Sequence, residues 1–125
     1  MLREFVWNDL VAETEWLDRS VFHLDGPDAI RHLGTLFELP KLHAIQWVPG
    51  EKLPRESVLK WIPLLRCIQA ANRAIHLSVQ PEEVEPLLLA LAPEGLLLRT
   101  ACDTEEEAKD LVRRVEKLSR PGKHF

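Results

Sequence analysis

A short apolar strand followed by a turn and a helix recurs four times along the chain, and this recurrence limits the fold more than any other feature. The predicted strands cover residues 20–25, 43–48, 74–79 and 96–101, and a segment with helical periodicity follows each one. Strands separated by helical segments of this length are typical of parallel sheets with right-handed crossovers. The sequence therefore predicts an α/β fold.

An amphipathic helix over residues 3–19 precedes the first strand. The later helices are expected over 28–39, from Pro54 or Glu56 to Arg73, over 81–91, and from Asp103 or Thr104 to about 118. Pro63 should kink the second of these. The prediction is one domain over 1–125, with an N-terminal helix, four βα units and a loose tail over 118–125.

Composition excludes several classes of protein. The net charge is -4 and Arg113-Arg114 is the main basic cluster, which argues against a nucleic-acid partner. No apolar run approaches the roughly 20 residues of a membrane-spanning helix. The two cysteines, Cys67 and Cys102, make no disulfide framework, so the expected compartment is the cytoplasm.

The first strand ends in the stretch His23-Leu24-Asp25-Gly26-Pro27. His23 and Asp25 are two residues apart and share one face of the strand, while Phe22 and Leu24 share the other. Gly26 and Pro27 end the strand and start a helix. Polar side chains at the carboxyl end of a parallel strand are where α/β proteins place their chemistry.

The same alternation extends this polar face across the predicted sheet. Strands two and three point Ile45, Trp47, Ile75 and Leu77 toward the helices. Strand four is ambiguous, but Leu98, Thr100 and Cys102 share a parity. One face would then collect His23, Asp25, Gln46, His76, Ser78, Thr100 and Cys102. So many polar or thiol groups favour a pocket or a wet interface over a plain core.

Four βα units are half of an eight-stranded barrel and would leave two free sheet edges and one bare face. Two copies could close one barrel by two-fold symmetry. The competing closure is a monomer in which a helix covers the bare face.

Several segments resemble the C-terminal half of the uroporphyrinogen decarboxylase superfamily, which includes cobalamin-dependent methyltransferases. The resemblance covers nearly the whole chain. It rests on SVFHLDG from Ser20, HAIQWVPG from His43, PEEVEPLL from Pro81 and the segment from Cys102 to Ala108. It implies a half TIM barrel. The decarboxylase branch uses residues of the N-terminal half, which this chain does not match, so the resemblance does not imply decarboxylase activity for this chain alone.

The methyltransferase branch binds zinc through a His-x-Cys pair and a later cysteine. By resemblance, His23 matches the first ligand and Cys102 the last, while Asp25 stands where the second ligand is a cysteine. Aspartate can also bind zinc. The resemblance thus implies a zinc site of His23, Asp25 and Cys102. The shared strand face adds Gln46, His76, Ser78 and Thr100 as pocket residues, and Trp47 is a candidate for the pocket rim.

Each candidate also has a structural explanation. Asp25 is a good helix N-cap, His23 could be a hydrogen-bonded core residue, and Cys102 could be a small buried residue. Trp47 is most simply a packing residue, and Cys67 is expected in the core. The acidic helix starts, among them Glu82, Glu83 and Glu85, are expected to be solvated.

Three functional hypotheses follow. The first is a zinc-dependent methyltransferase that acts on a small thiol or a methyl group carried by a corrinoid protein. The second is a non-catalytic half-barrel, which would be a module that binds a small ligand or a corrinoid protein, or a partner subunit for a separate N-terminal half. The third is a fragment of a longer barrel enzyme.

Overall fold

The computed structural model describes residues 6–48 and 57–119. In chain order the elements are α2 (Trp7–Trp16), β1 (Val21–Asp25), the 3-10 helix η1 (Pro27–His32), α3 (Leu33–Leu36), β2 (Ala44–Val48), the 3-10 helix η2 (Val58–Trp61), α4 (Ile62–Ala70), β3 (Ala74–Ser78), α5 (Pro81–Ala90), β4 (Leu96–Arg99) and α6 (Glu105–Ser119). This order confirms an α/β chain in which one helix precedes four βα units. None of the described helices is long and apolar enough to cross a membrane.

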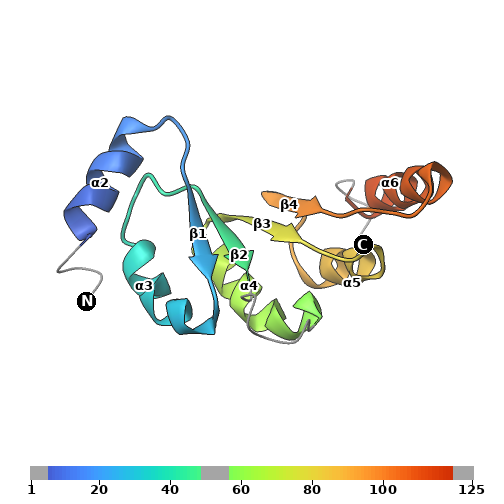
Figure 1. Ribbon diagram of the computed structural model, residues 1–125, viewed down its shortest axis with the longest axis horizontal. Helices are drawn as coiled ribbons and strands as arrows, with labels where there is room; N and C mark the ends of the chain where they lie inside the picture. The colour runs from blue at the N-terminus through green and yellow to red at the C-terminus, as the bar shows by residue number, and fades with distance from the viewer. Residues whose placement is uncertain (1–5, 49–56, 120–125) are drawn as a thin grey trace.

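The strands form one parallel sheet in the order β1-β2-β3-β4. Each strand lies beside its predecessor in sequence, so all crossovers move across the sheet in the same direction. Because βα crossovers share one hand, such a sheet carries its connecting helices on one face. Figure 1 shows α3, α4 and α5 on one side of the sheet, with α2 and α6 at its two ends. We call the side toward these three helices the covered face and the opposite side the open face.

The hydrophobic core lies between the covered face and the helices. Alternate strand residues are at most 2% exposed: Leu24, Ile45, Trp47, Ile75 and Leu77. The helices contribute Leu36, Leu65, Ile68, Leu87 and Leu111. The predicted alternation of the first three strands is thus confirmed, because period-two hydrophobicity reports which side of a strand is buried.

The side chains of the fourth strand lie on the opposite faces from those predicted. Leu97 pairs with His76, and Arg99 pairs with Ser78, so both β4 side chains lie on the open face. Leu97 is 62% exposed, whereas its neighbour Leu98 packs against the core.

The expectation that Leu98, Thr100 and Cys102 share the open face is therefore wrong. Cys102 packs against the hydrophobic core. The cause is the run Leu96-Leu97-Leu98, which is apolar in both parities and carries no period-two signal.

Local starts and stops of the helices also differ from expectation. The first crossover is a 3-10 helix followed by a four-residue α3. Its N-cap is Gly26, at φ 83°, with no side-chain cap, so the assignment of Asp25 as N-cap is wrong. The predicted kink at Pro63 is wrong, because Pro63 lies in the first turn of α4, where proline is tolerated.

The C-terminal end is only partly within the described residues. Leu118 and Ser119 belong to α6 and are half-buried, so the tail cannot begin at 118. The rest of the predicted tail, 120–125, lies outside the described residues, as do the predicted helix starts Pro54 and Glu56.

Glu83 joins two neighbouring helices and is only 7% exposed, in contrast to the solvated position expected for it. One carboxylate oxygen accepts a hydrogen bond from the backbone N–H of Gln80, at 2.7 Å, which closes the capping box of α5. The other accepts from the backbone N–H of Val58, at 2.8 Å, and from the Ser57 hydroxyl, at 2.7 Å. The start of η2 is therefore held against α5 at the carboxyl ends of the strands.

Candidate functional site

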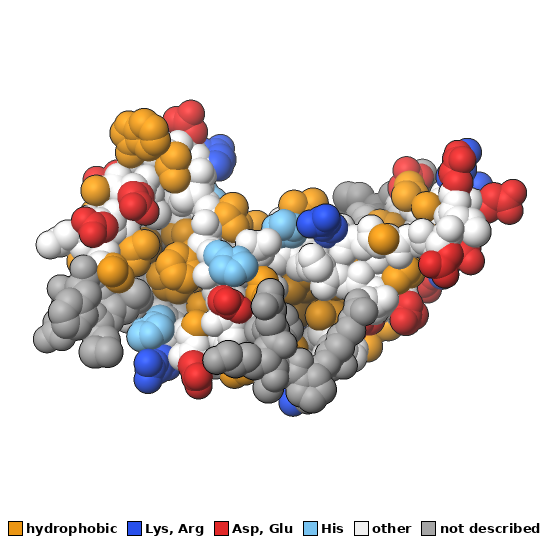
Figure 2. Space-filling model, in the orientation of Figure 1, with side chains coloured by type: hydrophobic (Ala, Val, Ile, Leu, Met, Phe, Trp, Pro, Cys, Tyr) orange, Lys and Arg blue, Asp and Glu red, His pale blue; other side chains and the backbone are white. Residues whose placement is uncertain are grey.

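The open face is the largest feature of the described molecule that its own helices leave unused. Its side chains are exposed or half-exposed in every strand. They are Val21, His23 and Asp25 of β1, Ala44, Gln46 and Val48 of β2, Ala74, His76 and Ser78 of β3, and Leu97 and Arg99 of β4. Figure 2 shows the molecule hollowed on its upper side, between the end that carries α2 and the end that carries α6.

The strand register arranges these side chains in rows. The middle row runs across the sheet as His23, Gln46, His76 and Leu97. At the carboxyl ends of the strands, Asp25 lies beside Val48, and Ser78 lies beside Arg99. At the amino ends, Val21, Ala44 and Ala74 make a row of smaller apolar side chains. The face is thus apolar at one end and charged at the other.

The middle row contains a hydrogen bond between strands. His23 Nδ1 and Gln46 Oε1 are 2.8 Å apart. An amide oxygen can only accept, so Nδ1 carries the hydrogen and Nε2 of the neutral ring is left as an acceptor. This bond fixes the orientation of the His23 ring on the open face.

The apolar end of the open face holds a shallow hollow of about 310 Å³, whose lining includes Val21, Ala44, Ala74, His76 and Leu97. Gly95 lies at its edge, where a Cβ would stand 3.3 Å from the Cβ of Ala74. His76 is the one polar side chain among its lining residues, so the hollow has the character of a surface depression more than of a ligand pocket.

The predicted zinc ligands are not brought together. His23 and Asp25 are exposed on the open face, whereas Cys102 packs against the core. Among residues 6–48 and 57–119 no cluster of three or more His, Cys, Asp or Glu side chains could hold a metal ion. This arrangement does not fit a three-ligand zinc site, and zinc binding stays a prediction from the resemblance.

The predicted pocket residues divide between the two faces. Gln46, His76 and Ser78 lie on the open face. Trp47 is 2% exposed and packs edge to face on Trp61, with ring centroids 5.1 Å apart, so it belongs to the core. The Thr100 hydroxyl is buried and has no hydrogen-bond partner among the described residues. Cys67, expected in the core, is exposed on α4.

Exposed hydrophobic side chains concentrate at the two ends of the sheet. Among the described residues, those at the β1 end are Val6, Trp16, Leu17 and Val21, and those at the β4 end are Leu97 and Val112. Leu89 of α5 is the remaining large one. Of these side chains, Val21 and Leu97 lie on the open face, where a partner could bury them.

The two edge strands also carry opposite charges. Asp25 is the last residue of β1 and Arg99 is the last residue of β4. Both are exposed and lie on the open face, and neither forms an ion pair with a described residue. Each edge therefore presents one exposed hydrophobic and one unpaired charge, Val21 with Asp25 and Leu97 with Arg99.

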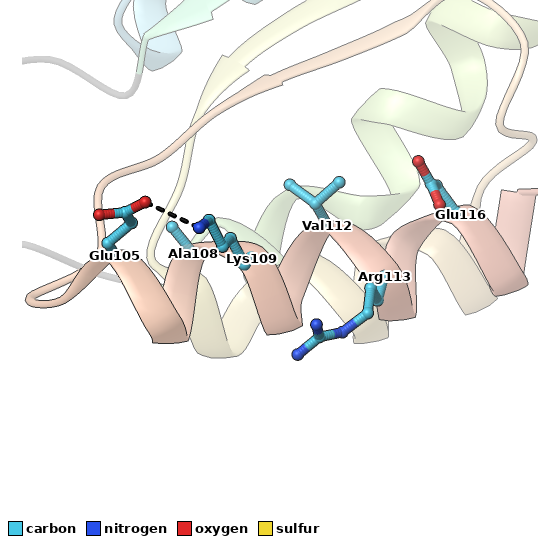
Figure 3. A pocket seen from close by; sticks show the side chains of 6 residues that line it. All are labelled: Glu105, Ala108, Lys109, Val112, Arg113 and Glu116. Atoms are coloured by element: carbon cyan, nitrogen blue, oxygen red, sulfur yellow. Dashed lines mark ion pairs between the residues drawn. The ribbon is translucent and has the colours of Figure 1, made fainter.

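A second depression of about 390 Å³ runs along the outer side of α6 (Figure 3). Its floor is Ala108 and Val112, and all of its lining comes from this one helix. Glu105 pairs with Lys109 at 2.8 Å along the helix. These charges are used within the helix, as is common on solvated helix surfaces, so the depression has no groups aimed at a ligand.

Leu97 and Arg99 were not predicted on the open face, and no signal in the sequence assigns them to it. Glu83 could have been found, because Gln80 and Glu83 have the spacing of a capping box.

No known protein family, curated protein or solved structure matches this chain.

Proposed function

We propose that this chain is an association module whose open face and two sheet edges bind a second copy of the same chain. The two copies would form a two-fold βα barrel of eight strands, in which each chain supplies a half TIM barrel. The observation that carries the proposal is the strand order β1-β2-β3-β4, with its helices on one face and the other face bare.

A bare parallel sheet is unusual on physical grounds. Parallel sheets occur almost only where both faces are covered, by the helices of the βα crossovers or by closure into a barrel. Free edges also present unpaired backbone groups that can pair with another strand. Closure by a second copy would cover the face and use both edges at once, since all strands run in one direction.

The charges at the edges support a copy of this chain as the partner. In a two-fold barrel, β4 of one copy lies beside β1 of the other, and this contact occurs twice. We call each such contact between β4 and β1 a seam. Arg99 and Asp25 are the last residues of these strands, so Arg99 of one copy lies at the same end of the seam as Asp25 of the other. The opposite charges that each chain leaves unpaired would thus pair between copies.

The exposed hydrophobics support the same arrangement. Leu97 and Val21 lie on the two edge strands, on the face that would turn inward. Leu97 is 62% and Val21 is 59% exposed in the single chain. Burying such side chains contributes roughly 1.5–3 kcal/mol each, and a symmetric interface doubles the contribution.

This proposal takes the place of the zinc-dependent methyltransferase as the leading hypothesis. The methyltransferase needs Cys102 beside His23 and Asp25, and Cys102 packs on the core side. An association module needs only the open face and the edges. A complementary half-barrel from another chain is the alternative partner. The charge-exchange experiment below distinguishes it from a second copy of this chain.

A charge exchange across the seam tests the proposal. Asp25→Arg and Arg99→Asp should each weaken self-association by about tenfold, because each places like charges at both seams. The double variant restores opposite charges and should return the affinity to near that of the unchanged chain. The readout is the dissociation constant from sedimentation equilibrium.

A double variant that associates no better than the two single variants would contradict the pairing of Asp25 with Arg99. A chain that stays monomeric at high concentration would contradict the choice of a second copy and direct attention to a complementary subunit.

A further inference from the structure

We propose that Trp16 of each copy packs into the depression on α6 of the other copy, so that outer helices as well as sheets hold the two copies together. This inference rests on the proposed function and adds a second contact surface to it. Trp16 is the last residue of α2 and is 84% exposed. Tryptophan is highly buried on average, and it is enriched among the residues that carry the binding energy of interfaces.

The other apolar side chains of α2 are already used within the chain. Trp7, Leu10 and Val11 pack against the hydrophobic core. Trp16 and the next residue, Leu17, lie outside that core, and Leu17 is 41% exposed. α2 therefore packs one side on its own chain and presents a large aromatic side chain outside it.

The α6 depression offers an apolar surface for such a side chain. α6 lies against α5 and turns Leu111, Val115 and Leu118 toward the core. The floor of the depression is on another side of the helix and consists of Ala108 and Val112, which is 56% exposed. Figure 3 shows both floor side chains on the same side of the helix. A hollow of about 390 Å³ with an apolar floor fits an apolar ring better than a polar ligand.

The order of the elements brings the two surfaces to the same place. α2 lies at the β1 end of the sheet and α6 lies at the β4 end (Figure 1). In the two-fold barrel, α6 of one copy and α2 of the other therefore border the same seam, and this happens twice. Trp16 precedes Val21, the first residue of β1, by five residues. Five residues span at most about 18 Å, so Trp16 stays near the seam.

The charges of the two helices are compatible with this contact. The charged side chains of α2 are all acidic: Asp9, Glu13 and Glu15. Glu13 is three residues before Trp16, on the same side of the helix, and forms no ion pair with a described residue. The rim of the depression carries two bases and two acids: Lys109, Arg113, Glu105 and Glu116. Glu105 is paired with Lys109, whereas Arg113 has a longer contact of 3.6 Å with Asp110. Arg113 is the rim charge that Glu13 of the other copy would pair with.

A double-mutant cycle tests the contact on the full chain. Trp16→Ala and Val112→Ala should each raise the dissociation constant by about tenfold, because each removes the contact at both seams. The two changes together should raise it little more than Trp16→Ala alone, since they remove the same contact. Leu89→Ala is the matched control, because Leu89 is 73% exposed on α5, outside both surfaces. Sedimentation equilibrium gives the dissociation constants, and far-UV circular dichroism follows the fold.

We expect Leu89→Ala to associate as the unchanged chain does. An unchanged dissociation constant for Trp16→Ala or Val112→Ala overturns the inference and leaves the proposed function standing. The same holds for a double variant whose loss is the product of the two single losses, because residues that do not touch have independent effects. An equal loss in Leu89→Ala overturns the inference as well. An unchanged chain that is monomeric at high concentration overturns the proposed function, and the inference with it.

Discussion

At the scale of single residues, Glu83 shows how one side chain determines where two helices begin. Its carboxylate accepts hydrogen bonds from the backbone N–H groups of Gln80 and Val58 and from the Ser57 hydroxyl. A buried carboxylate is tolerated because its oxygens are supplied with donors. Glu83 lies in an acidic segment of the sequence, and such segments are usually solvated. Composition does not show which carboxylate of the segment is buried.

Replacing Glu83 with Gln should therefore destabilise the fold by about 2 kcal/mol. The amide keeps one accepting oxygen, and its NH₂ group faces N–H donors that then lack a partner. The measurement is the free energy of unfolding from urea denaturation at fixed protein concentration. Glu82→Gln is the control, because Glu82 is the exposed neighbour in the same helical turn and should change stability by less than about 0.5 kcal/mol. Equal losses in the two variants would contradict the role assigned to Glu83.

At the scale of elements, hydrophobic alternation predicts the faces of β1, β2 and β3. In each of these strands, one apolar and one polar neighbour in sequence face opposite sides of the sheet. The neighbours are His23 and Leu24, Ile45 and Gln46, and His76 and Leu77. β4 has no such contrast, because Leu96, Leu97 and Leu98 are all apolar. Its orientation comes from pairing with β3, which is a tertiary contact that the local sequence does not encode.

This single reversal also explains most of what the sequence could not provide about the site. The zinc hypothesis came from the resemblance, and the parity expected for β4 agreed with it by placing Cys102 on the same face as His23. Cys102 packs against the core instead. Trp47 was a candidate for the pocket rim against its own alternation, and its burial agrees with the alternation.

The turns between elements give a further prediction. Gly26 ends β1 and Gly95 precedes β4, and both have positive φ, 83° and 73°. Gly26 combines φ 83° with ψ 158°, a region that essentially only glycine occupies, so Gly26→Ala should destabilise the fold by about 1–3 kcal/mol although the space around it is open. Gly95→Ala should also destabilise the fold, because its Cβ would lie 3.3 Å from the Cβ of Ala74. The measurement is the free energy of unfolding of each variant, and an unchanged value for Gly26→Ala would contradict the backbone argument.

At the scale of the whole molecule, the central observation is a sheet that is covered on one side only. Recurrence of strand and helix predicts the parallel sheet, and the consecutive strand order follows from short crossovers between neighbours. No described helix covers the open face, and neither periodicity nor composition predicts what does. Leu97 and Val21 are exposed, and Asp25 and Arg99 form no ion pair with a described residue, so the proposed second copy could contact all four.

The most direct test is the mass of the full chain in solution, with one variant on each side of the sheet. We expect twice the chain mass of 14.4 kDa for the unchanged protein at neutral pH, because closure by two copies covers both open faces. Leu97→Glu should give the monomer mass, since it places a charge in the enclosed surface. Leu89→Glu should remain dimeric, because Leu89 is 73% exposed on α5, away from the open face. An unchanged chain of monomer mass, or a Leu97→Glu variant that stays dimeric, would contradict the account.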